Sequence, residues 1–246
     1  MSLATFVHDG VASVQAGDAV TLDGSEGHHA VTVRRIRAGE QIALTDGAGT
    51  TAVVTVTSTG KKSLEGTVDT VTSAAAEVQR VVVVQAIPKG ERGELAVEML
   101  TEVGVDVIVP WAASRSIAVW KGERAEKSLA KWRSAAREAA KQARRSWFPE
   151  VTDVASTDDV AALLAKAGVP VVLHEAASGP LSNIPIPGRA EIVIVVGPEG
   201  GISDEELAAF AAVGAEPVRM GSSVLRSSTA GVAAAAALLS RTPRWR

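Results

Sequence analysis

Two short glycine-rich segments decide the fold of this chain: residues 196–203, with the sequence VGPEGGIS, and residues 220–231, with the sequence MGSSVLRSSTAG. Each follows a hydrophobic run and precedes a predicted helix, which places both at the carboxyl ends of β-strands. Loops at that edge of an open α/β sheet are where such folds bind small ligands. Neither segment has the spacing of a phosphate-binding loop or of a dinucleotide-binding fingerprint. The pair therefore predicts a pocket for another kind of ligand.

The amino-terminal part has the pattern of a small β domain. Short runs rich in β-branched residues, separated by turn residues, predict strands at 19–22, 41–45, 51–57 and 64–71. Strands of this length and spacing indicate a closed or nearly closed barrel. One helical segment is expected near residues 27–35, and residues 73–77 are expected to link the barrel to a second domain.

From residue 78 onward the pattern is that of an α/β domain. The apolar run at 81–87 predicts a strand buried on both faces. Periodicity then predicts helix 91–103, strand 105–109, helices 123–145 and 158–167, strands 169–173 and 191–196, helix 204–213, strand 217–220 and helix 228–240. Such alternation indicates a mostly parallel sheet. Ser203, with Glu206 three residues later, is expected to cap the helix that starts at residue 204.

The composition excludes several classes of function. The 246-residue chain has no cysteine, which removes disulfides, thiolate nucleophiles and zinc–thiolate sites, and four histidines are too few to indicate a metal site. No apolar run reaches the roughly 18 residues of a membrane span. The amino terminus lacks the pattern of a signal peptide. We therefore expect a cytoplasmic protein that needs neither a membrane nor a metal.

A mildly acidic protein carries one concentrated basic segment. The formal net charge is -3, yet residues 115–145 hold ten basic and three acidic side chains. Arg133, Arg137, Lys141 and Arg144 recur at helical spacing and predict a basic stripe. The segment indicates a polyanion bound on one face, although a solvated helix face would produce the same pattern.

The two glycine-rich segments suit a nucleoside-like ligand. Gly197, Gly200 and Gly201 allow the backbone to approach a ligand closely, and Pro198 stiffens the turn. Arg226 is the lone cation of the second segment. Backbone N–H and C=O groups could bind an adenine edge and ribose hydroxyls, with apolar side chains on both faces of the ring. From the residues alone the ligand stays open.

Together the two segments resemble the signature of the SPOUT-class RNA methyltransferases, and within that class the ribosomal RNA small subunit methyltransferase E family. The resemblance extends over nearly the whole chain, with matching blocks at 28–29, 33–35, 44–49, 89–90, 101–105, 114–116 and 138–145, and with Pro149. It implies an α/β domain at 78–246, whose region 192–240 is threaded into a trefoil knot. It also implies a PUA-like β-barrel RNA-binding domain at 1–73 and a homodimer.

The implied activity is transfer of a methyl group from S-adenosylmethionine to N3 of one uridine in 16S rRNA, near the decoding region of the small ribosomal subunit. The implied cofactor-binding residues are Leu173, His174, Val196, Gly197, Pro198, Glu199, Gly200, Gly201, Met220, Gly221, Val224, Leu225, Arg226, Ser228 and Ala230. The implied RNA-binding residues are Arg34, Arg35, Lys89, Arg115, Arg137, Lys141, Arg144 and Arg145.

Arg226 and Glu199 are the candidate catalytic residues on this scaffold. N3 of uracil lies between two carbonyl groups, so its attack on the methyl group requires loss of the N3 proton or stabilisation of negative charge on O2 or O4. Arg226 could stabilise that charge, or could instead contact a phosphate or a second subunit. Glu199 could act as a base, or could instead anchor its own loop.

The chain departs from the family pattern at Ser228, where relatives commonly carry glutamate, so that glutamate cannot be the base here. It also lacks a lysine that relatives often carry before the block at 101–105. Two alternatives to uridine-N3 methylation therefore remain. One is methylation of a ribose 2′-hydroxyl or of tRNA, and the other is a non-catalytic RNA-binding ribosome-assembly factor.

Overall fold

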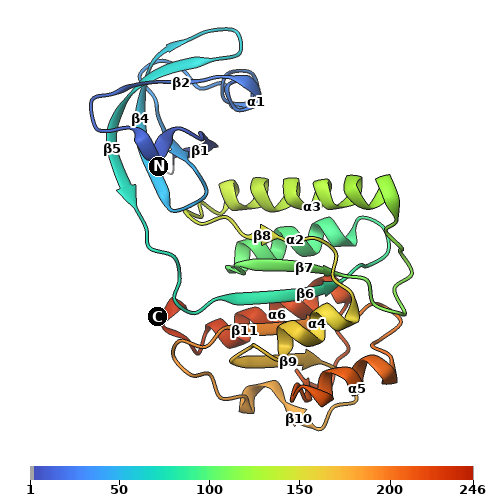
Figure 1. The fold of residues 1–246 in the computed structure, drawn as a ribbon. Helices are drawn as coiled ribbons and strands as arrows, with labels where there is room; N and C mark the ends of the chain where they lie inside the picture. The colour runs from blue at the N-terminus through green and yellow to red at the C-terminus, as the bar shows by residue number, and fades with distance from the viewer. Residues whose placement is uncertain (1–2, 246) are drawn as a thin grey trace. The chain divides into compact units, whose positions relative to one another are not determined.

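The computed structural model describes residues 3–245, which form two compact units (Figure 1). The first unit contains the described residues up to Ala76 and, later in the chain, Ala140–Phe148. The second unit contains Glu77–Ala139 and the chain from Pro149 onward. Residues 140–148 thus belong to the first unit although they are separated from it in the sequence, and no sequence pattern predicts this.

A five-stranded sheet forms the first unit, in the order β1-β3-β4-β5-β2. β1 runs parallel to β3, and the other neighbours are antiparallel. β1 and β2 remain at opposite edges, so strand pairing among the described residues does not close the sheet into a barrel. The bounds are β1 (Ala4–Val7), β2 (Ala19–Leu22), β3 (Gln41–Thr45), β4 (Thr50–Thr59) and β5 (Leu64–Ser73).

One side of this sheet is apolar and is covered by short helices. In β4, Ala52, Val54 and Val56 are buried at every second position, as expected of a strand with one buried face. Val11 and Ala30 pack into the same core from the helices. The helical elements are η1 (Val11–Ser13), α1 (Gly24–His28) and the π-helix η2 (His29–Val33), so the helix expected near 27–35 is present.

The turn at residues 46–49, between β3 and β4, receives Trp147 and Phe148. Gly47 and Gly49 have positive φ angles of 68° and 106°. A Cβ on Gly47 would lie 2.7 Å from the Phe148 ring, and one on Gly49 would lie 2.7 Å from Ala74 O and 2.8 Å from the Trp147 ring. Trp147 Nε1 also donates to Ala74 O at 2.8 Å. Both glycines are therefore required by close packing as well as by backbone conformation.

The second unit contains a seven-stranded sheet in the order β10-β12-β9-β11-β6-β7-β8, and every strand pair is parallel. The prediction of a mostly parallel sheet is confirmed. The central strands β6 and β11 are buried along their whole length. The bounds are β6 (Val81–Ala86), β7 (Val107–Trp111), β8 (Glu150–Val151), β9 (Val169–Leu173), β10 (Gly179–Pro180), β11 (Ile192–Val196) and β12 (Pro217–Arg219).

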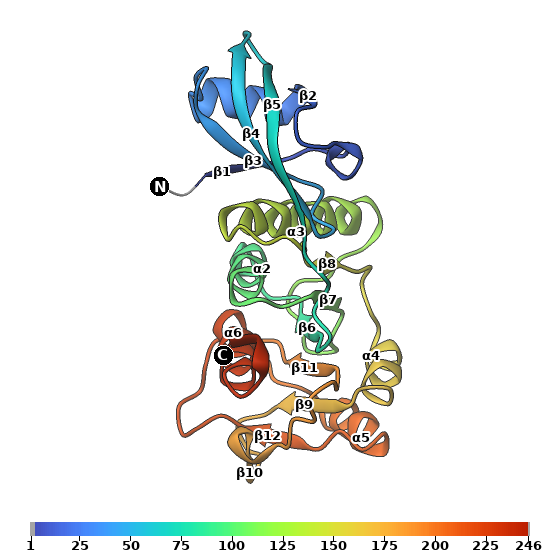
Figure 2. The ribbon, with the colours of Figure 1, turned by 90° about the vertical axis from the view of Figure 1, so that its left-hand side faces the viewer.

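Helices cover both faces of this sheet (Figure 2). Alternate residues of β6 point to opposite sides: Val81 and Val83 pack with α2, α3 and α6, whereas Val82 and Val84 pack with α4 and α5. The bounds are α2 (Arg92–Val103), α3 (Gly122–Gln142), α4 (Thr157–Leu164), α5 (Asp204–Ala212) and α6 (Ser227–Leu239), with short turns η3 (Leu181–Asn183) and η4 (Pro243–Trp245). None of the helices in the described part of the chain is long and apolar enough to cross a membrane.

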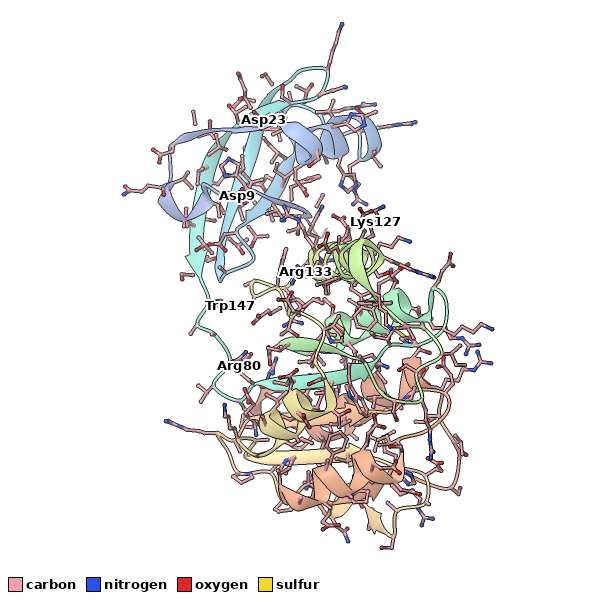
Figure 3. All side chains as sticks on the ribbon, turned by 45° about the vertical axis from the view of Figure 1, so that its right-hand side comes forward. Asp9, Asp23, Arg80, Lys127, Arg133 and Trp147 are labelled. Atoms are coloured by element: carbon pink, nitrogen blue, oxygen red, sulfur yellow. The ribbon has the colours of Figure 1, made fainter. Side chains whose placement is uncertain are left out.

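The predicted basic stripe on α3 is not formed. Arg133, labelled in Figure 3, donates to Val151 O at 3.1 Å and to Asp153 Oδ1 at 2.9 Å. Lys141 is 6% exposed, and its ammonium lies 2.9 Å from Glu26 Oε1. The helix ends at Gln142 rather than at residue 145, so Arg144 lies beyond it, with a φ of 54°. Arg133 and Lys141 thus pair with acidic residues that are distant in the sequence, and they do not form the stripe that their helical spacing predicted.

Arg244 ties the carboxy-terminal part of the chain to the start of β6. Its Nη1 donates to Asp106 Oδ2 at 2.6 Å and to Gln79 O at 3.1 Å, and its Nη2 donates to Gly104 O at 2.8 Å. Asp106 Oδ2 also accepts from Val81 N at 2.8 Å. Because both charged side chains are largely buried, removing one leaves the other without its partner in a poorly solvated place.

We predict that Arg244→Ala lowers the free energy of unfolding by about 3 kcal/mol, the size typical of breaking a buried ion pair. Urea unfolding followed by circular dichroism measures this change. Arg241→Ala is the matched control, because exposed Arg241 donates one side-chain hydrogen bond within residues 3–245, to Ile184 O. We expect the control to change stability by less than about 1 kcal/mol. Equal effects of the two changes would contradict the structural role of Arg244.

Candidate active site

A pocket of about 340 Å³ lies at the carboxyl ends of β9, β11 and β12, against the first turn of α6. The structure thus brings the two glycine-rich segments together at one edge of the sheet. The pocket is lined by Arg92, Leu173, His174, Glu175, Val196, Gly197, Pro198, Glu199, Gly201, Ile202, Val218, Arg219, Met220, Gly221, Ser223, Val224, Leu225, Arg226, Ser227 and Ala230. Its volume is in the range of small-molecule sites.

Most of the residues predicted to bind a cofactor line this pocket, but Gly200 and Ser228 do not. A Cβ on Gly200 would lie 3.1 Å from Arg115 Cβ and O, so this glycine allows close packing between loops. Ser228 is 5% exposed in the first turn of α6. Seven lining residues were not among the predicted ones: Arg92, Glu175, Ile202, Val218, Arg219, Ser223 and Ser227. Ser223 and Ser227 lie inside the second segment and could have been included, whereas no sequence signal indicated Arg92.

The first segment is held by the buried carboxylate of Glu206. Ser203 caps α5, and its side chain and that of Glu206 form the predicted capping box. Glu206 Oε2 accepts from Ser203 N at 2.9 Å, and Oε1 accepts from Ser114 N at 2.7 Å and from Thr157 Oγ1 at 3.3 Å. One carboxylate therefore fixes three separate parts of the chain beside the pocket.

Arg115 also supports the first segment. Its Nη1 donates to Ile202 O at 3.4 Å, and its backbone packs against Gly200. The pKa of the nearby Glu205 is lowered by a hydrogen bond from its own backbone N–H, then by the Ser203 side chain, with a smaller contribution from the Arg115 charge. The structure thus places Arg115, a predicted RNA contact, against the loop that forms the pocket wall.

Glu199 is anchored to the start of α2. Its Oε1 accepts from Lys89 N at 3.3 Å and lies 3.6 Å from Arg92 Nη1. Lys89 lies in the connection between β6 and α2, and Arg92 is the first residue of α2, so Glu199 ties the first segment to the start of that helix. This geometry favours the anchoring role of Glu199 over the role of a base.

Arg226 lies at the N-cap of α6, where its carbonyl accepts from Thr229 N and Ala230 N at 3.0 and 2.9 Å. Its side chain is exposed and lines the pocket. Within residues 3–245 its guanidinium has neither a hydrogen bond nor an ion pair. Of the two candidate catalytic residues, Arg226 therefore has a charge that is free to act on a ligand, and Glu199 does not.

The predicted RNA-binding residues fall in both units. Arg34, Arg35 and Arg144 are exposed in the first unit, and Arg145 is partly exposed there. Lys89 and Arg137 are exposed in the second. The prediction that Lys141 binds RNA is wrong. Its ammonium group lies in a buried ion pair with Glu26 and is not accessible to a phosphate. Arg35 has a φ of 57°, a left-handed conformation that favours glycine.

Two protein-family models match this chain and define its class. The RNA methyltransferase domain family matches residues 75–239, which is more than half of the chain. The RNA methyltransferase PUA domain family matches residues 22–69. The two matches agree with the two kinds of sheet described above.

Individual relatives narrow this class. Ribosomal RNA small subunit methyltransferase E of Mycobacterium tuberculosis is 43% identical over 233 residues, which cover 93% of this chain and 89% of that protein. The protein of the same name from Bacillus subtilis is 28% identical, with 93% of each chain covered. The crystal structure of ribosomal RNA small subunit methyltransferase E from Neisseria gonorrhoeae, bound to S-adenosyl methionine, has a TM-score of 0.85 at 26% identity and covers 98% of both chains.

The chain therefore belongs to the ribosomal RNA small subunit methyltransferase E family. This confirms the resemblance that the two glycine-rich segments indicated.

We predict that Glu206→Ala lowers the free energy of unfolding by about 2–4 kcal/mol, because it leaves buried donors without an acceptor. Chemical denaturation measures the change. Glu205→Ala is the matched control, since Glu205 is the exposed neighbour on the same helix turn. Because Glu205 is exposed, we expect the control to change stability by less than about 1 kcal/mol. If both variants were as stable as the wild-type protein, Glu206 would not be what holds the first segment.

Proposed function

We propose that this protein transfers a methyl group from S-adenosylmethionine to N3 of one uridine in the 16S rRNA of the small ribosomal subunit. The observation that carries the proposal is the pocket in which both glycine-rich segments meet, with the unpaired charge of Arg226 at its wall. Family membership supports the reaction class, and the Neisseria gonorrhoeae relative was solved with S-adenosyl methionine bound.

The residues of the pocket fit this cofactor. Leu173, Ile202, Val218 and Met220 provide apolar walls suited to an adenine ring. The charged lining residues Arg92, Glu175 and Arg219 are exposed, which suits the zwitterionic amino-acid part of the cofactor. Gly197 and Gly201 keep the wall free of side chains where the backbone would approach the ligand. When bound, the cofactor supplies a methyl group made electrophilic by its sulfonium.

Arg226 is the residue that we assign to the chemistry. Loss of the N3 proton would leave negative charge shared by N3, O2 and O4 of the ring. The N3 anion would then take the methyl group as S-adenosylhomocysteine leaves. A guanidinium already free of other partners can stabilise that charge without first giving up a bond. Glu199 is assigned to anchoring the first segment, because Lys89 and Arg92 already hold its carboxylate. Ser228 carries no carboxylate, so the base is left unassigned.

RNA binding is assigned to exposed or partly exposed cations in both units. Arg34, Arg35, Lys89, Arg137, Arg144 and Arg145 would contact phosphate oxygens and set the register of the RNA without reading bases. The target uridine would leave its stack to reach the pocket, as enzymes that act on bases generally require. Because the substrate belongs to the ribosome, we place the protein in the cytoplasm.

Two further features belong to the same proposal. The chain leaves β11, forms α5 and β12 at the far side of β9, and returns to pack α6 on β6 and β11, a path compatible with a trefoil knot. Cyclising the folded chain tests the knot: a knotted ring stays more compact in denaturant, by small-angle scattering, than a ring closed after unfolding.

The exposed apolar Val224 and Leu225 support a homodimer, which light scattering would detect as twice the chain mass.

The decisive experiment incubates the purified protein and labelled S-adenosylmethionine with small ribosomal subunits that lack the modification. We expect the label in N3-methyluridine of 16S rRNA. Label in another nucleotide or in a ribose would show that the methylated position is not N3 of a uridine in 16S rRNA. The glutamate missing at Ser228 motivates one rival, a non-catalytic assembly factor. Cofactor binding with no transfer, beside an active control enzyme, would establish that rival instead.

We predict that Arg226→Ala retains cofactor binding while the single-turnover rate of methyl transfer falls about 10²–10³-fold, as is typical of losing one preorganised electrostatic donor. Calorimetry with S-adenosylhomocysteine and rapid-quench transfer assays measure the two quantities. Arg189→Ala, an exposed arginine outside the pocket lining, is the control and should change neither. A parallel loss of binding and transfer would make Arg226 a cofactor anchor instead.

We predict opposite effects of Arg35→Gly on stability and on RNA affinity. Glycine adopts the left-handed conformation of this position without strain, so stability should rise by up to about 1 kcal/mol. Removing one phosphate contact should make the negative slope of log affinity against log salt shallower by roughly 0.7–0.9. Denaturation and RNA binding across a salt series test the two effects, with Arg80→Gly as a control outside the proposed RNA contacts. An unchanged salt slope would exclude Arg35 from those contacts.

A further inference from the structure

Ser227 is a buried serine that lines the pocket and lies at the first position of α6. It is 8% exposed, and its hydroxyl oxygen is shielded from solvent with no hydrogen-bond partner in the described part of the chain. An unpaired buried hydroxyl destabilises a protein, because folding removes its bonds to water and returns none. Such groups are rare in native structures, and each one requires an explanation.

The position of Ser227 on α6 adds further donors at the same place. The first backbone N–H groups of a helix have no acceptor within the helix. The N-cap residue Arg226 makes no side-chain hydrogen bond to them. A ligand atom that accepts hydrogen bonds would therefore find a hydroxyl and backbone N–H groups together, and the hydroxyl can turn about its Cα–Cβ bond without breaking an existing bond.

The surroundings of Ser227 indicate which part of a ligand reaches it. Ala230, one helical turn further on, and the nearly buried Val196 and Val218 line the same pocket. The charged lining residues, in contrast, are exposed. Bringing a carboxylate to a hydroxyl that is shielded from solvent would cost more desolvation energy than bringing an uncharged aromatic base there.

We propose that the Ser227 hydroxyl hydrogen-bonds the adenine ring of the cofactor and helps to select it. The proposal rests on the proposed function, because it assigns a contact within the S-adenosylmethionine pocket. Ser227 is then a cofactor-binding residue rather than a structural one. The unpaired state of its hydroxyl in the free protein is relieved when the ring binds.

The neighbouring Ser228 provides a matched control. It lies in the same helix turn and is 5% exposed, but it does not line the pocket. Ser227→Ala and Ser228→Ala therefore remove the same atom from adjacent buried positions. Two ligands show which end of the cofactor contacts Ser227. S-adenosylhomocysteine contains both the adenosine and the amino-acid part, whereas 5′-methylthioadenosine contains only the adenosine.

The test measures dissociation constants of both ligands by calorimetry and the melting temperature of each ligand-free variant. We expect Ser227→Ala to weaken both ligands by the same factor, about five- to tenfold, the usual effect of one hydrogen bond. Its ligand-free melting temperature should not fall, since an unpaired hydroxyl is lost. Ser228→Ala should leave both affinities within twofold of the wild-type protein.

Three outcomes would overturn the assignment. Weaker binding of S-adenosylhomocysteine alone would place the hydroxyl at the amino-acid end. Unchanged affinity for both ligands would remove Ser227 from the contact. A lower melting temperature of ligand-free Ser227→Ala, with unchanged affinity in the folded fraction, would make its role structural. Failure of the wild-type protein to bind either ligand would instead overturn the proposed function, together with everything that rests on it.

Discussion

The buried carboxylate of Glu206 is the contact on which the pocket depends most. It accepts hydrogen bonds from the N-cap of α5, from the loop after β7 and from the start of α4. These three segments are far apart in the sequence, and none of them could hold its position alone, because short loops have little core of their own. Buried polar groups of this kind stabilise a structure only when all their bonds are made. The wall of the pocket formed by the first segment is therefore held by Glu206, a residue that does not itself line the pocket.

The two glycine-rich segments differ in how they are held. The first is fixed by Glu206, by Arg115 and by the link from Glu199 to Lys89 and Arg92. The second is exposed from Gly221 to Arg226. Proposed cofactor binding thus combines a preformed wall with a more accessible one. The carboxylate of Glu199 is bound by Lys89 N and Arg92, whereas the guanidinium of Arg226 has no partner among residues 3–245, and the roles proposed for the two residues follow from this difference.

Patterns over a few neighbouring residues predicted the features of the fold that depend on those residues alone. The buried strands, the parallel sheet and the cap formed by Ser203 and Glu206 follow from residue types at short spacing, and all are confirmed. The meeting of the two segments also followed, because parallel strands end at one edge. The strands β1, β8 and β10 were missed, and β8 and β10, with two residues each, are too short to carry a periodic pattern.

Contacts between distant residues could not be predicted in the same way. Helical spacing placed Lys141 on a solvent-facing stripe, but only the folded chain brings Glu26 to it. In the same way, nothing local indicates that Arg115 packs on Gly200 or that Arg92 lines the pocket. Ser227 was visible in the sequence, yet its missing hydrogen bond could be recognised only once its neighbours were placed.

The packing of Trp147 and Phe148 on the turn at 46–49 constrains how this protein can change over evolution. The segment 140–148 is held near one end by Lys141 on Glu26 and at the other by these two rings on Gly47 and Gly49. Its length is therefore fixed, and an inserted residue would have to bulge outward. An exchange of the amino-terminal domain between relatives would also need to carry this distant segment with it. The two pieces form one heritable module, although more than sixty residues of the other unit separate them in the sequence.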